Sequence, residues 1–82
     1  MNRENEVARI GLAVAAAIKS RREALNMSKN GLAQKAGISV QAVCFIEGSV
    51  NSPSLTTLLR ICIALDVPPD FLLREALEKA PS

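Results

Sequence analysis

The chain has 82 residues, of which 49% are hydrophobic, 22% are charged and 2% are aromatic, and its formal net charge is +2. This length allows one small domain, and the balance of apolar and charged residues is that of a folded globular protein rather than a disordered one. Histidine is absent and the two cysteines, Cys44 and Cys62, lie far apart, which removes the commonest general base and the usual zinc and redox motifs, so we expect no enzyme activity, no metal and no cofactor.

The first predicted helix covers residues 4–26. Its apolar residues recur at helical spacing, at Val7, Ile10, Val14, Ile18 and Leu25. The longest apolar run, residues 10–18, is nine residues, which is about half the ~20 that span a bilayer. The N-terminus also lacks the pattern of a signal peptide. We therefore expect no membrane contact, a cytoplasmic location and two free thiols.

Two short helices follow, each introduced by a serine. Ser28 is the predicted N-cap of a helix over 29–36 that Gly37 ends, and Ser39 is the predicted N-cap of a helix over 40–47. Alternation with a period of two is absent from the sequence, so we expect no strands.

The last third of the chain predicts two more helices. Ser54 caps a helix that ends at Leu65, and Pro69 takes the first position of a fifth helix. The apolar residues of the fourth helix predict a broad buried face made of Leu55, Leu58, Leu59, Ile61, Cys62 and Leu65. The five helices predict one all-α domain over residues 1–82.

The fifth predicted helix carries more apolar surface than one side of a short helix buries within its own subunit. We therefore expect a dimerisation region at about residues 66–80, and four residues are expected to form the dimer interface: Leu72, Leu73, Ala76 and Leu77. The alternative is that all of them pack on the core of the same chain.

Positive charge gathers in the first third of the chain. Residues 1–30 hold six basic and three acidic residues, with Lys19, Arg21, Arg22 and Lys29 closely grouped. This asymmetry fits an anionic partner on one side of the domain, although a solvated helix face would look the same.

Residues 28–47 have the spacing of a helix-turn-helix. A small residue, Ala33, stands where the second helix crosses the first, and Gly37 permits a positive φ in the turn. The inward positions are apolar: Leu32, Ala36, Ile38, Val43 and Ile46. An ordinary αα-hairpin would share one or two of these features, whereas the full set favours binding to double-stranded DNA.

The sequence resembles the Cro/repressor-type (XRE, lambda-repressor-like) helix-turn-helix regulators over about residues 12–73. The matching positions are Ile18, Arg22, Met27–Ser28, Leu32–Ala33, Ala36–Gly37–Ile38–Ser39, Val43, Ile46–Glu47, Pro53–Ser54–Leu55 and residues 58–72. The resemblance implies a compact five-helix lambda-repressor-like domain. It also implies a transcription regulator, which we expect to act as a homodimeric repressor on a two-part operator, with no small-molecule ligand.

The resemblance also implies particular roles for residues. Residues 40–47 would be the recognition helix in the major groove, with four outward residues reading bases: Val40, Gln41, Cys44 and Phe45. Phosphate contacts are expected from Arg22, Ser28, Lys29, Ser39, Asn51 and Ser52. The helix-turn-helix itself would be built by Leu32, Ala33, Gly37, Ile38, Val43, Ile46 and Glu47. Glu47 would pair with Arg22, unless both are free surface charges.

The four residues expected to read bases form a mostly apolar face, because only Gln41 among them carries a strong hydrogen-bonding group. Apolar side chains packed on thymine methyl groups, with Gln41 reading adenine, predict a half-site biased to A·T. Alternatively, the helix binds a protein, as in an antitoxin-like interaction module, or Phe45 folds back into the core. Ser49 stands where the family often has a glycine, and we expect Gly48 to take that role.

Overall fold

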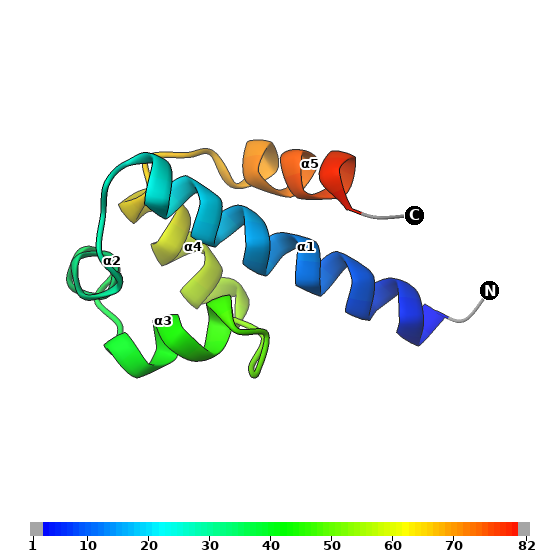
Figure 1. Cartoon of the computed structure of the whole chain (residues 1–82), viewed down its shortest axis with the longest axis horizontal. Coiled ribbons are helices and arrows are strands. Elements are labelled where there is room, and N and C mark those ends of the chain that lie inside the picture. The colour runs from blue at the N-terminus through cyan, green and yellow to red at the C-terminus, as the bar shows by residue number, and fades with distance from the viewer. Residues whose placement is uncertain (1–2, 81–82) are drawn as a thin grey trace.

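The computed structural model describes residues 3–80, which form five helices and, over that range, no strand. The helices are α1 (Arg3–Ala24), α2 (Lys29–Ala36), α3 (Val40–Glu47), α4 (Leu55–Ala64) and α5 (Pro69–Lys79). α1 runs along the length of the molecule with α5 packed beside it, while α2, α3 and α4 gather around the C-terminal half of α1 (Figure 1). The predicted all-α class is confirmed, and the predicted helix ends agree with the observed ones to within two residues.

Serine side chains start three of the helices. Each of these serines has an extended backbone, and its hydroxyl oxygen accepts a hydrogen bond from the backbone N–H three residues later, which satisfies a donor that the helix itself leaves free. The three bonds are Gly31 N to Ser28 Oγ at 2.9 Å, Ala42 N to Ser39 Oγ at 3.0 Å and Thr57 N to Ser54 Oγ at 3.1 Å. α5 instead begins at Pro69, whose missing N–H costs nothing at that position.

A left-handed residue follows each of the first four helices. Gly37, with φ of 71°, ends α2, and the N–H of Ile38 bonds back to the carbonyl of Ala33 at 3.0 Å. The equivalent residues after α1, α3 and α4 are not glycines; they are Asn26, Ser49 and Asp66 with φ of 55°, 59° and 54°. The expectation that Gly48 would take the glycine role after α3 is wrong, because Gly48 has φ of −85° and Ser49 makes the turn.

The core lies where all five helices meet. Its largest fully buried side chains are Ile18, Leu32, Val43, Ile61, Cys62, Leu65 and Leu72. The predicted buried face of α4 is too broad, since Leu55 is 72% exposed and Leu59 is 39% exposed. α4 packs against α2 and α5 on one side only, so its opposite flank stays in solvent.

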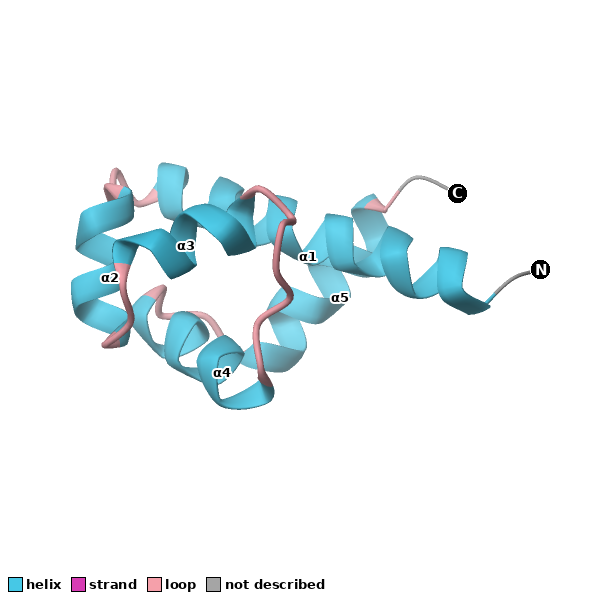
Figure 2. Cartoon of the chain, turned by 90° about the horizontal axis from the view of Figure 1, so that it is seen from below, coloured by secondary structure: helices cyan, strands magenta, loops and turns pink. Residues whose placement is uncertain are grey.

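α5 places its apolar residues differently from the expectation. Leu72 and Ala76 are buried against the core of their own subunit, so their predicted role as partner contacts is wrong. Leu73 and Leu77 are 37% and 50% exposed and lie on a neighbouring flank of the helix. The view from below shows α5 lying along α1, which explains why one face of it is covered (Figure 2).

Candidate nucleic-acid interface

α2, the turn at Gly37 and α3 form a helix-turn-helix. Leu32 and Ala33 of α2 and Val43 and Ile46 of α3 are buried in the shared core, as their spacing predicts. Ile38 in the turn is half-buried and packs against the same core. These contacts fix the angle between the two helices, so the opposite side of α3 is held facing outward.

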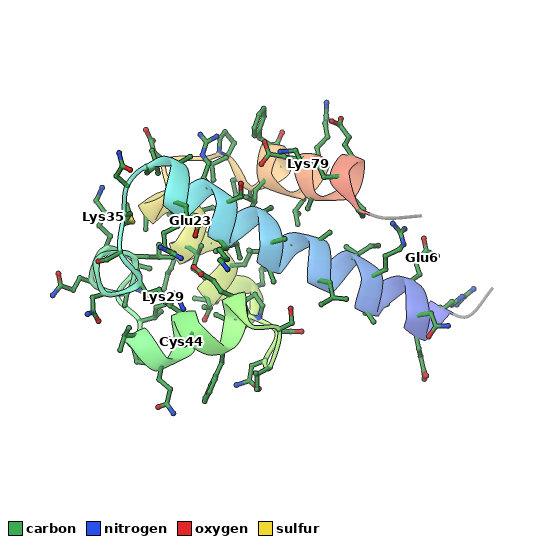
Figure 3. All side chains as sticks on the ribbon, in the orientation of Figure 1. Glu6, Glu23, Lys29, Lys35, Cys44 and Lys79 are labelled. Carbon is green, nitrogen blue, oxygen red and sulfur yellow. The ribbon has the colours of Figure 1, made fainter. Side chains whose placement is uncertain are left out.

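The outward side of α3 carries the four predicted base-reading residues. Val40 is 41% exposed, and Gln41 and Cys44 are also exposed. Phe45 is half-buried but belongs neither to the core cluster nor to the residues packed against it, so it does not fold back into the core. Figure 3 shows Cys44 on α3 and Lys29 on α2 on one side of α1, away from Glu6 near the N-terminal end of α1 and from Lys79 on α5 across α1. This arrangement leaves the side of α3 open to a partner.

Polar groups border α3 on both sides. Ser28 and Lys29 at the start of α2 are exposed, as is Ser39 at the start of α3. After α3, Asn51 and Ser52 are exposed in a loop that is fixed to the helix, because the N–H groups of residues 50 and 51 donate to the carbonyl of Phe45 at 2.8 and 3.3 Å. The predicted phosphate-binding residues other than Arg22 are therefore exposed in the segments that precede and follow α3.

Arg22 has a different role from the predicted one. Its Nε and Nη2 donate to the two carboxylate oxygens of Glu47 at 2.7 and 3.0 Å, and its Nη1 donates to the carbonyl of Met27 at 2.8 Å. Because Arg22 is only 7% exposed, the prediction that it binds a phosphate directly is wrong. The predicted pairing with Glu47 is confirmed. The bond to Met27 involves a backbone group, and the sequence therefore carries no signal for it.

This pair ties the C-terminal end of α1 to the C-terminal end of α3. The hydrogen bond from Glu47 raises the pKa of the Arg22 guanidinium, although burial acts in the opposite direction. The arginine is therefore charged throughout the accessible pH range, and its planar head fixes both oxygens of the carboxylate. α3 is thus positioned by an ionic contact as well as by its core residues.

The two thiols differ in their surroundings. Cys62 is buried in the core, and burial raises the pKa of its thiol, so it is kept in the unreactive protonated form. Cys44 is exposed on α3. Among residues 3–80, no group of acidic or cysteine side chains is placed to hold a metal ion, and no helix there is long and apolar enough to cross a membrane.

Comparison with known proteins points to one class. Residues 18–72 match the model of a helix-turn-helix family. Among solved structures, the chain is similar to the restriction-modification controller protein C.AhdI from Aeromonas hydrophila, with 26% sequence identity and a TM-score of 0.72 over 74% of this chain and 92% of that one. No match was found among curated proteins.

Proposed function

Because this chain belongs to the XRE/Cro-type helix-turn-helix family of DNA-binding transcriptional regulators, which are not enzymes, we propose that it is a repressor that binds a two-part operator as a homodimer. In this proposal α3 enters the major groove of each half-site with its N-terminal end at the base edges. Bound dimers would then block a promoter.

The observation that carries the proposal is the outward face of α3. Val40, Gln41 and Cys44 are exposed, while the opposite face of the helix is buried. Gln41 supplies a carboxamide that matches N6 and N7 of adenine, and the apolar side chains match the methyl group of thymine. We therefore propose half-sites rich in A·T pairs.

The residues around α3 support contacts with the DNA backbone. Lys29 offers a charge, and the hydroxyl or amide groups of Ser28, Ser39, Asn51 and Ser52 offer neutral hydrogen bonds to phosphate oxygens. With one lysine in this group, most of the predicted phosphate contacts are neutral. Affinity should therefore fall with salt less steeply than for an interface made of lysines and arginines.

The homodimer is proposed because a domain of this size contacts too few bases to select one site in a genome. Of the predicted interface residues, Leu73 and Leu77 keep surface that a second copy can cover. The likeness to C.AhdI, which is described as a controller protein, supports a regulatory role for this chain as well.

Titration of the protein against random-sequence duplex DNA at several salt concentrations tests the proposal. We expect binding that weakens with salt, and a Lys29→Ala variant should lower the slope by about one charge per subunit. Lys79→Ala, on α5 across α1 from α3, is the matched control and should leave the slope unchanged. Negligible DNA binding would instead favour a module that uses the apolar face of α3 on a protein.

A further inference from the structure

An apolar groove lies beside the first half of α1, outside the helix-turn-helix. The first turns of α1 extend beyond the other four helices in both views (Figures 1 and 2). The groove has a volume of about 470 Å³ and lies between α1, the loop after α3 and single leucines from α4 and α5, Leu58 and Leu73. Asn51 and Ser52, which we propose as phosphate contacts, stand on the loop side of this groove and are exposed, so a partner helix seated in it must leave their polar groups open to DNA. α1 lines it with Val7, Ala8, Gly11, Leu12, Val14 and Ala15.

The N-terminal part of the α1 side of this groove is largely uncovered within the subunit, whereas Val14 and Ala15 pack toward the core. Val7 is 70% exposed and Leu12 is 60% exposed. A helical segment that buries so little is marginal in water, because helices in proteins are stabilised mainly by packing. The family model begins at Ile18, so this segment lies outside the matched part of the chain. DNA binding by the helix-turn-helix therefore does not account for it.

Gly11 is a second indication that a partner packs against this part of α1. It lies in the interior of α1, where glycine destabilises a helix relative to alanine. A Cβ built on Gly11 would meet no atom within 4 Å, so nothing inside the subunit requires glycine at this position. A glycine there leaves room for another backbone to approach closely.

We propose that the groove is filled by the first half of α1 from a second copy of the chain, so that two α1 helices pair about a two-fold axis. The inference rests on the homodimer proposed above and adds α1 to the surface around Leu73. A two-fold pairing is self-complementary, so Val7 and Leu12 of each copy lie in the groove of the other. Over residues 3–9 two arginines and two glutamates cancel, and the two segments meet without net repulsion.

The length of α1 also makes this pairing compatible with a two-part DNA site, because it sets the distance between the two copies of α3. α3 meets α1 between Val14, which shares the groove lining with Ile46, and Arg22, which binds Glu47. A partner helix seated on Gly11 places the two-fold axis near the midpoint of Val7 and Gly11, and at about 1.5 Å per residue the two positions lie ~8 and ~20 Å from that point along the helix. The axis thus separates the two copies of α3 by roughly 15 to 39 Å, a range that includes the ~34–36 Å between half-sites one helical turn apart.

Sedimentation equilibrium of the full chain tests the pairing. We expect the native chain to be a dimer and Leu12→Glu to raise its dissociation constant at least about a hundredfold, because the symmetry repeats the loss at two places. Ile63→Glu is the matched control, since Ile63 is 79% exposed on α4 and does not line the groove. It should change the dissociation constant less than about threefold. Both residues are exposed, so circular dichroism should show the native helix content in each variant.

Gly11→Leu distinguishes specific packing of a partner helix against Gly11 from non-specific hydrophobic association. The substitution adds apolar surface at an open position, so non-specific association would become tighter, whereas a partner helix seated on Gly11 would be pushed away and the dimer would weaken. Three results would overturn this pairing alone: a dimer that survives Leu12→Glu, a dimer that Ile63→Glu weakens as much as Leu12→Glu does, or a dimer whose dissociation constant Gly11→Leu leaves unchanged or lowers. A native chain that stays monomeric, both free and on DNA, overturns the proposed homodimer as well.

Discussion

Arg22 and Glu47, 25 positions apart in the chain, form a two-pronged ion pair between α1 and α3 in which the two side chains are 9% and 3% exposed. A pair buried to this degree is a constraint on geometry, because separating it leaves a charge in a place that water does not reach. It holds α3 at a fixed angle to α1, the longest helix of the fold. The orientation of α3 therefore depends on residues that lie outside its exposed face.

Removing one partner of this pair should be costly. Glu47→Ala leaves the buried Arg22 guanidinium without its counter-ion, and we expect the free energy of unfolding to fall by about 3–5 kcal/mol, measured by urea denaturation. The double variant Arg22→Met with Glu47→Leu removes both charges and should recover much of this loss. A loss below about 1 kcal/mol for Glu47→Ala would mean that the pair behaves as an exposed one.

The two turns that flank α3 respond oppositely to glycine. Gly37 has φ of 71°, so Gly37→Ala forces a side chain into the left-handed region and should cost about 1–2 kcal/mol. Ser49 has φ of 59° and already bears that strain, so Ser49→Gly should be neutral or stabilise by up to about 1 kcal/mol. Thermal unfolding of both variants checks the signs, and equal effects in the same direction would contradict the turn geometry.

Substitutions at Ser39 separate helix capping from phosphate binding. Ser39→Ala removes the bond from the N–H of Ala42 and should cost about 1 kcal/mol of stability. Ser39→Asp keeps a capping oxygen, so stability should stay within about 0.5 kcal/mol of the native value, while the added negative charge repels phosphate and weakens DNA binding. Unfolding and DNA titrations on the same samples give both readouts. Undiminished DNA binding by Ser39→Asp would place the phosphate elsewhere.

Stability should fall at alkaline pH because of Cys62. Burial raises the pKa of its thiol in the folded state above the ordinary value of 9.0, so the unfolded chain releases this proton at a lower pH than the folded one. The contribution is fully present below pH 9 and is lost as the pH rises from there through the folded pKa. Urea denaturation between pH 7 and pH 10.5 should show the decline, and Cys62→Ala should flatten it. An equally steep decline in that variant would assign the effect to other groups.

Local signals in the sequence predict the helices well. Three serine caps and Gly37 mark helix ends through bonds made within a few residues, and Pro69 marks one through its fixed φ and missing N–H, so no knowledge of the tertiary structure is needed to place these ends. The inward residues of the helix-turn-helix follow from the spacing of the motif for the same reason.

What the sequence leaves open depends on how the helices are arranged. Leu55 and Leu72 have the same chemistry, yet one is 72% exposed and the other is fully buried, because α4 is covered on one side while α5 lies on α1. Arg22 has the composition of a phosphate ligand, and only the positions of Glu47 and the carbonyl of Met27 show that it is already occupied. Such outcomes follow from contacts between distant segments.

Base recognition through the exposed face of α3 is the central claim, and selection of bound duplexes from a random-sequence pool tests it most directly. The native chain should enrich a two-part site with A·T-rich half-sites, and Gln41→Ala should lose preference for adenine at one position in each half while it still binds duplex DNA. An identical enriched sequence for both proteins, or no enriched sequence at all, would contradict direct reading by α3.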